Sequence, residues 1–384
     1  MRILMVNAYG YVTGGADRHC LALADALRTR GHNVAFLSAA SESNVVTTGR
    51  FVPPLVTHAN RDSLPLRRRA KVAGYALWNP DSARAMRELI DEFRPDVVHA
   101  HKVYIQLSVS PLVVAARHAV PIIQTLHDYE LLAASALDDT GGWHDRDEAR
   151  LSYRALNTAT YPVRRLVHRQ CVRAWISPSR FLAGRYAARG IRAHVLPHFV
   201  ERSGDSPALA FSERRGAVFV GRLTSAKGVI DVLEVARHLP DTRVTVAGEG
   251  PLAAEVAAEA RRLPNLEFVG FQNHNGVLRL LRSARIALMP SRWQEPAGLV
   301  ALEAMSVGTP VLAYSSGGLA EYVSEAGAGQ LVPGCAGALA RACAALANDS
   351  RVWEGFSKAG LNAVDDTHAI ERYTKRLENI YAMV

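Results

Sequence analysis

Short apolar runs alternate with longer amphipathic stretches along this chain, and the alternation limits the folds that it can adopt. The runs in the first half that have the length and apolar character of buried strands are Ile3–Val6, Val34–Leu37, Asp96–Ala100 and Ile122–Leu126. Helical periodicity lies between them, over Cys20–Leu27, Asp81–Phe93 and Tyr104–Arg117. Strands joined in this way by helices predict a parallel sheet with helices on both of its faces.

A second alternating series follows the loose stretch Pro197–Arg215, which is rich in Pro, Gly, Ser and charged residues. Its expected strands are Ala217–Val220, Arg243–Ala247, Leu266–Val269, Ile286–Met289 and Pro310–Ala313. Because 384 residues suit two domains, we expect an α/β chain with two tandem doubly wound, Rossmann-like domains, residues 1–199 and 200–366. Ligands of such sheets bind beyond the carboxyl ends of the strands, so two facing domains would hold one in the cleft between them.

The composition excludes several other classes of protein. Hydrophobic residues make up 49% of the chain and charged residues 21%, as in globular proteins, and no apolar run is long enough to cross a membrane. Cys20, Cys171, Cys335 and Cys343 are scattered without C-x-x-C pairing. Their spacing argues against a disulfide framework or a zinc ribbon and favours a cytoplasmic location.

The net charge of +9 is concentrated in the first half of the chain. Residues 1–200 hold 26 basic and 16 acidic residues, whereas residues 201–384 hold 19 and 20. A basic half is compatible with nucleic acid, an anionic membrane surface or a phosphorylated ligand. No helix-turn-helix, RNA-recognition or zinc-finger pattern accompanies it, so we expect no nucleic-acid partner.

The segment PSRWQEPAGLVALEAMSVGTPVLA, residues 290–313, carries two carboxylates around the predicted start of a helix. Glu295 and Glu303 would lie roughly 12 Å apart along a helix axis, wider than the about 5–9.5 Å between the two carboxylates of a glycoside hydrolase. The backbone N–H groups of Gly298, Leu299 and Val300 lie between them and suit a phosphate. The pattern favours a ligand with an anionic centre and hydroxyl groups at both ends, such as a sugar nucleotide. On spacing alone, an internally satisfied Glu303 and a solvated Glu295 explain it equally well.

Two further segments carry groups suited to phosphate. In VFVGRLTSAKG, residues 218–228, an apolar strand ends just before Arg222 and Lys227, which could neutralise a leaving diphosphate without a metal ion. The alternative is a solvated basic loop. Near the start of the chain, the Gly14–Gly15 pair opens a helix and would let a ligand approach its N–H groups, although a tight turn explains the pair as well. No G-x-G-x-x-G follows the first strand, which disfavours a dinucleotide site.

Histidines mark the ends of two predicted strands in the first half. PIIQTLHDYE, residues 121–130, places His127 and Asp128 at the carboxyl end of a buried strand, where His127 could hydrogen-bond a sugar or acceptor hydroxyl. The alternative is a histidine satisfied by the backbone. His99 and His101 share one face of the preceding strand, but no third ligand has suitable spacing. We therefore expect these two to be structural or to line the cleft, and we expect no metal site.

Together these motifs resemble those of the GT-B glycosyltransferases, specifically the retaining glycosyltransferase family 4 of nucleotide-sugar enzymes. Motifs in the order of that family span nearly the whole chain: GGADRH, LHD, SPSRF at 177–181, GRLTSAKG, VAGEGP at 246–251, EPAGLVALEAMSVGTPVLA and GGLAEYV at 317–323. The resemblance implies the GT-B fold and a hexosyl- or pentosyl-transferring enzyme. It also implies a nucleoside diphosphate sugar as donor, with UDP favoured over GDP, and no metal or other cofactor.

The resemblance further implies roles for individual residues. Those that would hold the donor diphosphate are Arg222 and Lys227, with the backbone at Gly15, Gly298, Leu299 and Val300. Glu303 would accept from the nucleotide ribose, Glu295 from the sugar hydroxyls, and His127 would contact the sugar near the reacting carbon. The departing phosphate would take the acceptor's proton on the same face, which retains the configuration. The last helix, Thr367–Met383 within residues 367–384, would cross back onto the first domain.

Three positions depart from the family pattern. Ala297 stands where an aromatic residue is usual, so the sugar subsite is expected to be altered. Asp17 replaces the usual Glu after Gly-Gly-Ala, and PHFVE at residues 197–201 departs from the common Pro-Asn-Gly hinge. None of these changes removes a charged group that the transfer needs.

The expected acceptor depends on an acidic stretch in the first domain. Residues 128–148 hold seven acidic residues and one basic residue. Such a cluster could recruit a cationic small molecule, such as an aminocyclitol or aminoglycoside intermediate, and its candidate contacts are Asp128, Glu130, Asp138 and Asp139. A solvated acidic loop is the alternative. Asp145 and Asp147 form a D-x-D pattern that chance alone explains.

A membrane-surface enzyme of lipid-linked or envelope polysaccharide synthesis is the alternative function. LPLRRRAKVAGYALW, residues 64–78, combines four cations with apolar and aromatic residues and could lie on anionic lipid. A sugar-nucleotide epimerase and a binder without transfer activity share the same fold. The favoured expectation is a monomer or dimer that uses a small-molecule acceptor without membrane contact, in natural-product or polysaccharide biosynthesis.

Overall fold

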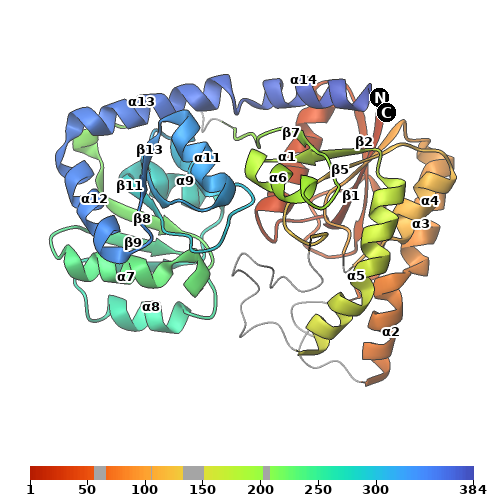
Figure 1. The fold of residues 1–384 in the computed structure, drawn as a ribbon, viewed down its shortest axis with the longest axis horizontal. Helices are drawn as coiled ribbons and strands as arrows, with labels where there is room; N and C mark the ends of the chain where they lie inside the picture. Colours follow the sequence, from red (N-terminus) through yellow and green to blue (C-terminus); the bar gives the residue numbers. More distant parts are fainter. Residues whose placement is uncertain (56–65, 105, 133–150, 202–207) are drawn as a thin grey trace.

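The computed structural model describes residues 1–55, 66–104, 106–132, 151–201 and 208–384, which form two domains (Figure 1). The strands of the first domain are β1 (Arg2–Tyr9), β2 (Asn33–Ala39), β3 (Gly49–Val52), β4 (Val97–Ala100), β5 (Ile122–Thr125), β6 (Ala174–Ser177) and β7 (His194–Val195). Its helices are α1 (Gly15–Thr29), α2 (Leu66–Leu77), α3 (Pro80–Phe93), α4 (Ser110–Arg117), α5 (Leu151–Cys171) and α6 (Arg180–Ala187).

The second domain repeats the same architecture. Its strands are β8 (Arg215–Val220), β9 (Val244–Ala247), β10 (Leu266–Gly270), β11 (Ala284–Met289), β12 (Val311–Tyr314) and β13 (Gly329–Val332). Its helices are α7 (Val229–His238), α8 (Ala253–Ala260), α9 (His274–Ser283), α10 (Leu299–Ser306), α11 (Gly317–Ala326), α12 (Ala336–Asn348) and α13 (Ser350–Asp366). Short 3₁₀ turns occur at Phe211–Glu213 and Ser225–Lys227, and a last helix, α14, spans Ile370–Tyr381.

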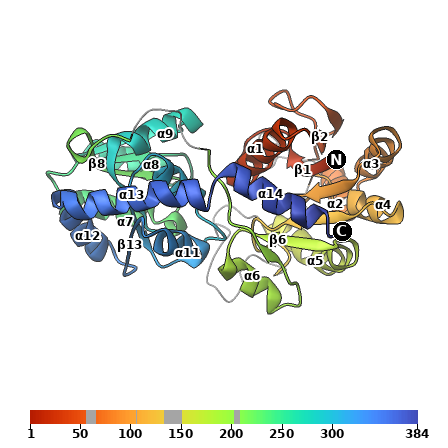
Figure 2. The ribbon, with the colours of Figure 1, turned by 90° about the horizontal axis from the view of Figure 1, so that it is seen from above.

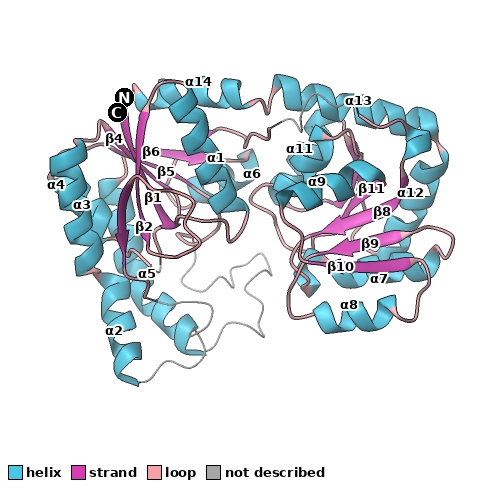
Figure 3. Cartoon of the chain, turned by 180° about the vertical axis from the view of Figure 1, so that it is seen from behind, coloured by secondary structure: helices cyan, strands magenta, loops and turns pink. Residues whose placement is uncertain are grey.

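Each domain is built on one parallel sheet (Figure 3). The strand order is β3-β2-β1-β4-β5-β6-β7 in the first and β10-β9-β8-β11-β12-β13 in the second. Both orders reverse direction beside the first strand of the domain, as in doubly wound folds. Separate apolar clusters lie on the two faces of each sheet, so helices cover both faces. The predicted fold of two doubly wound α/β domains is confirmed.

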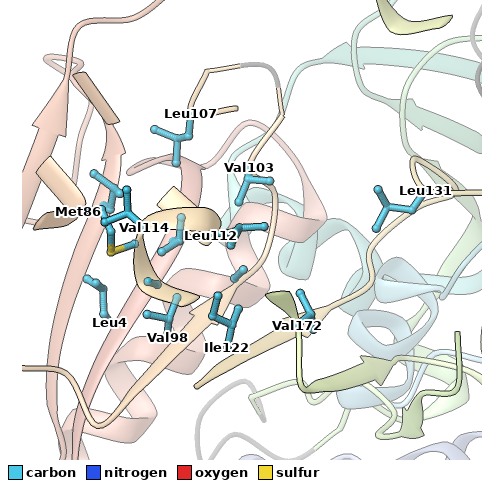
Figure 4. Packing of buried hydrophobic residues seen from close by; sticks show 14 of the residues in the cluster. Leu4, Met86, Val98, Val103, Leu107, Leu112, Val114, Ile122, Leu131 and Val172 are labelled. Carbon is cyan, nitrogen blue, oxygen red and sulfur yellow. The ribbon is translucent and has the colours of Figure 1, made fainter. Parts of the chain in front are cut away.

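The core of the first domain follows from the apolar runs in its strands. Leu4, Val98 and Ile122 come from three neighbouring strands and are fully buried. They pack against Met86 of α3 and Leu112 of α4 (Figure 4). Burying one such side chain contributes about 1.5–3 kcal/mol to the stability of the fold. The packed side chains therefore fix the strands, and with them the loops at the strand ends.

Some elements differ from those expected. The helix predicted over Tyr104–Arg117 begins only at Ser110, because Ser108 adopts a left-handed conformation with φ 59° and Pro111 suits a first helical turn. Strands β3, β6, β7 and β13 were not predicted. Each spans at most four residues, and three of them, β3, β7 and β13, lie at sheet edges, where few of their positions are buried.

The last helix leaves the second domain and lies against the first. Figure 2 shows α13 running along the second domain and α14 continuing over the first. Tyr373, Leu377 and Ile380 of α14 are buried in the same apolar cluster as Leu27 of α1. The carboxylate of Glu378 is held by Arg30, with Nε–Oε1 and Nη2–Oε2 distances of 2.6 and 2.7 Å. The first domain therefore completes one side of its core with residues from the far end of the described chain.

None of the helices within the described ranges combines the length and the apolar character needed to span a bilayer.

Candidate functional site

The carboxyl ends of the two sheets meet at the boundary between the domains. The Tyr129 hydroxyl, beyond β5, donates to the Gln294 carbonyl oxygen at 2.6 Å, and the Ser179 hydroxyl, beyond β6, donates to that of Pro296 at 2.6 Å. Glu321 of α11 accepts from the backbone N–H of Arg180 at 2.8 Å, at the start of α6. The segment between β11 and α10 is therefore fixed to the first domain, which is where ligands of doubly wound sheets bind.

Two helices point their N-termini at this boundary. A Cβ atom on Gly15, at the start of α1, would lie 2.7 Å from Leu299 Cδ1, at the start of α10, so a larger residue there would make the Leu299 side chain move. Their N-caps, Gly14 and Gly298, provide no side-chain hydrogen bond. Because the first N–H groups of a helix have no partner within it, both ends can receive an anion. The structure thus brings Gly15 close to the segment of Gly298, Leu299 and Val300.

Lys227 lies beside Glu295. The Thr224 side chain caps the short 3₁₀ turn that ends at Lys227. Gly228 follows with φ 75°, and a Cβ atom there would overlap the Pro290 carbonyl oxygen. This close backbone contact places Lys227 Nζ 2.5 Å from Glu295 Oε1, which also accepts from the Ser291 hydroxyl at 2.8 Å.

Arg222 and Trp293 lie near Lys227, Arg222 along the chain and Trp293 in space. Arg222 is exposed on the loop that leaves β8, five residues before Lys227. The Trp293 ring lies with its centroid 5.2 Å from Lys227 Nζ and contacts Tyr129 of the first domain edge to face. No role for Trp293 was predicted from the sequence, and only its place between two motif residues could have suggested one.

Glu303 lies in α10 and is almost fully buried. Its carboxylate forms an ion pair with Arg18 of α1 across the domain boundary. The ring of His274, at the start of α9, lies with Nδ1 3.5 Å from Glu303 Oε1 and 2.9 Å from Arg18 Nη1. Sequence reasoning missed Arg18 and His274. A cation near the positive end of the α1 dipole is unfavourable, and this was the signal that could have marked Arg18.

Glu295 and Glu303 are therefore placed differently. Glu295 precedes α10 and faces a cation of its own domain, whereas Glu303 lies within the helix and faces a cation of the other domain. Gly318 N–H donates to the Glu295 carbonyl oxygen at 2.7 Å and joins the start of α11 to this segment. The two acids thus flank the start of α10 along the chain, one before it and one a turn into the helix.

Buried histidines line the first-domain side of the boundary. His127 Nε2 lies 2.9 Å from Nδ1 of His101, and burial lowers the pKa of both rings. The rings of His19 and His198 also approach His127, with centroids at 5.7 and 5.5 Å. His99 bonds the Thr125 hydroxyl through Nε2 at 2.8 Å and the Tyr381 hydroxyl through Nδ1 at 2.7 Å, so both of its ring nitrogens are engaged within the first domain and α14.

The candidate acceptor residues are only partly described. Glu130 is paired with buried Arg164 at 2.5 Å, and burial raises its pKa to about 6. Asp128 Oδ1 accepts from the Glu130 N–H at 2.9 Å. Asp138 and Asp139 lie outside the described residues. Within the described ranges no three His, Cys, Asp or Glu side chains are grouped so that they could hold a metal ion.

Comparisons with known proteins match both halves of the chain. The Glycosyltransferase Family 4 model matches residues 13–203, and the model Glycosyl transferases group 1 matches residues 205–362. Glycogen synthase of Mycobacterium tuberculosis is 31% identical over 363 residues, which cover 84% of this chain and 80% of that protein. Phosphatidyl-myo-inositol mannosyltransferase of Mycobacterium leprae is 27% identical over 380 residues, covering 95% and 92%.

Solved structures share the fold. Sucrose-phosphate synthase from Thermosynechococcus elongatus superposes with a TM-score of 0.74 at 18% identity, covering 100% of this chain and 98% of that one. Anabaena HepE in complex with UDP-glucose superposes with a TM-score of 0.72 at 18% identity, covering 100% of both chains. The two-domain arrangement is that of the GT-B proteins.

Proposed function

The chain belongs to the family 4, group 1 glycosyltransferases, and we propose that it transfers a sugar from a nucleoside diphosphate sugar to an acceptor hydroxyl with retention of configuration. The observation that carries this proposal is the meeting of two helix N-termini at Gly15 and Leu299, beside a lysine and between two acids.

The diphosphate binds at the paired helix ends. Two helix N-termini that converge on one position, each with free N–H groups, stabilise negative charge more than one does. Lys227 lies on one side of this position, and Arg222 is exposed on the same loop. As the sugar leaves, charge grows on the diphosphate, so fixed donors at this point accelerate the reaction without a metal ion.

The two acids hold the groups at either end of the donor. Glu303 is buried and now satisfied by Arg18, and ribose hydroxyls can replace that cation as hydrogen-bond donors. Glu295 accepts from the sugar hydroxyls, while Lys227 turns from Glu295 to the phosphate. His127 contacts the sugar from the other domain.

Transfer breaks the bond between the anomeric carbon and the phosphate oxygen and forms one to the acceptor oxygen on the same face. The acceptor proton passes to the departing phosphate. Among donors we favour UDP-sugars over GDP-sugars, supported by the likeness to HepE, which was solved with UDP-glucose.

The acceptor is proposed to be a cationic small molecule drawn by the acids around residues 128–148. Asp128 is the remaining candidate among the described residues, because Glu130 already neutralises Arg164. A membrane-bound acceptor is the second candidate. It is favoured by the similarity to a phosphatidyl-myo-inositol mannosyltransferase and by the exposed Leu77 and Trp78 at the end of α2. Flotation with anionic vesicles separates the two: co-flotation favours the second candidate, and its absence favours the first.

A thermal-shift screen over nucleoside diphosphates tests donor binding. A ligand at a hundredfold excess over its Kd adds about 2.7 kcal/mol to the stability, so we expect a clear upward shift with at least one diphosphate. The double variant Arg222→Gln, Lys227→Gln should lose that shift. The matched control Arg351→Gln, Lys358→Gln removes two exposed cations from α13 and should keep it.

Product analysis then tests transfer. Nucleotide release from a panel of donor sugars should rise when an acceptor is added, and the product should keep the donor's anomeric configuration. Release that never depends on an acceptor argues for hydrolysis or epimerisation, and a double variant that still shifts with the nucleotide overturns the proposed diphosphate site.

A further inference from the structure

His101 and His127 form a hydrogen-bonded pair at the ends of two neighbouring strands. His101 follows β4 and His127 follows β5, and one hydrogen bond of 2.9 Å joins Nδ1 of the first to Nε2 of the second. The rings are nearly parallel, at 25°. One of the two atoms must carry the proton that is shared, and the choice decides what the rest of His127 can do.

The far side of the His101 ring decides between the two tautomers. His101 is 2% exposed, and its Nε2 is buried without a hydrogen-bond partner among the described residues. If His127 donated to His101, this Nε2 would have to carry an N–H group with no acceptor. If His101 donates, the same Nε2 is a bare lone pair. Buried donors without an acceptor are rarer in proteins than buried acceptors without a donor, so the second arrangement is favoured.

We propose that His101 is a positioning residue that donates from Nδ1 to His127 and so holds His127 as the neutral tautomer protonated at Nδ1. This inference rests on the proposed sugar transfer and deepens it, because it assigns the chemical role of the residue that faces the donor sugar. His127 Nδ1 has no hydrogen bond within the described ranges and is not among their fully buried polar atoms. His127 therefore presents an N–H donor to the ligand and does not act as a base.

The surroundings keep both rings neutral. Besides His101, the groups that face His127 are His19 of α1, His198 of the interdomain segment, His99 and Lys102. All of these are cations or rings that would become cations, so none of them would stabilise an imidazolium at His127. Burial and these neighbours lower the pKa of His127 and of His101. A neutral N–H donor suits a sugar hydroxyl or a phosphate oxygen, whose charge it can stabilise.

Nitrogen NMR of the histidine-labelled protein tests the tautomer directly, without substrate. The resonances of His127 are identified by their loss in His127→Gln. We expect a protonated Nδ1 and a bare Nε2 between about pH 7 and pH 8, where an imidazole of unperturbed pKa about 6.5 is already mostly neutral. A protonated Nε2 on His127, or a doubly protonated ring, overturns the proposal whether or not the protein transfers sugar.

Three substitutions of His101 separate positioning from general damage. Asn keeps an N–H donor near the position of Nδ1, Leu removes it, and Asp offers only acceptors. We expect His101→Leu to lose about tenfold to a hundredfold in kcat/KM, as removal of a supporting partner often does. His101→Asn should recover most of that loss, and His101→Asp should move the His127 proton to Nε2 and be at least as impaired as Leu.

His99→Asn is the matched control, since His99 is an equally buried neighbour with no bond to His127. It should leave the His127 resonances in place. Equal activity of the Asn and Asp variants at position 101 refutes the assignment. If no donor is turned over at all, the proposed function fails while the NMR result still decides the tautomer.

Discussion

The ion pair between Arg18 and Glu303 predicts that removing Arg18 strengthens nucleotide binding. Glu303 has a side chain only 6% exposed, and Arg18 reaches it from the other domain. If ribose hydroxyls bind Glu303, the guanidinium must leave first, so free protein and ligand compete for the same carboxylate. The substitution Arg18→Gln removes the competitor and keeps most of the side-chain volume.

The magnitude follows from the exposure of the pair. A hydrogen bond to a charged group contributes about 1.5–3 kcal/mol when it is well shielded. The Arg18 side chain is 33% exposed, and fixing so long a side chain costs entropy, which brings the value towards about 1 kcal/mol. That energy corresponds to roughly fivefold tighter binding. The pair is less shielded at high salt, so the gain should shrink as salt is added.

Isothermal titration with the diphosphate that gives the largest thermal shift measures this gain. Arg28→Gln is the matched control, because Arg28 lies on the same helix and pairs with Asp25 of that helix. Its affinity should equal that of the unmodified protein. Weaker binding by Arg18→Gln would refute the competition and would mean that Arg18 itself holds the nucleotide.

Two further outcomes are expected. Burial lowers the pKa of a set of histidines, which are therefore neutral in the fold but protonated below about pH 6.5 when unfolded: His19, His99, His101, His127, His168 and His198. The free energy of unfolding should therefore decrease as the pH is lowered below about 6.5, by about 1.4 kcal/mol per pH unit for each such histidine. Urea unfolding at about pH 7.5 and about pH 5.5 checks this, and equal stability at both would contradict it. Gly228→Ala should cost about 2 kcal/mol or more and lower nucleotide affinity, since a Cβ there meets the Pro290 carbonyl. Gly355→Ala, in an open helical position, is its control and should be neutral or stabilising by differential scanning calorimetry.

The fold was predictable because its strands are continuous apolar runs separated by helices. Such a run can be recognised from a few consecutive residues, without knowledge of its partners in the sheet. Ile3–Val6 and Ile122–Leu126 are examples whose neighbours in the sheet follow from the doubly wound pattern. The shorter β7 has two residues and leaves no such trace. The late start of α4 depends on the left-handed conformation of Ser108, which could not be predicted from the sequence around it.

The candidate site was predictable in its motif residues and not in their partners. Glycines at helix starts and the acids around them have a local physical reason, so Gly15, Leu299 and Glu295 could be named from the sequence. The pairing of Arg18 with Glu303 joins residues 285 positions apart, and depends on how two domains face each other. No short sequence pattern indicates a contact between residues so far apart in the chain. The roles of the named residues remain predictions.

The return of α14 to the first domain has a consequence for how the polypeptide is made. Tyr373, Leu377 and Ile380 fill a face of that domain that also includes Leu27, and they emerge from the ribosome only after the whole second domain. The face of the first domain that α14 covers therefore stays exposed during synthesis while some hundred and seventy more residues are added after residue 199. The first domain therefore reaches its full apolar core only once α14 has been made and has packed against it.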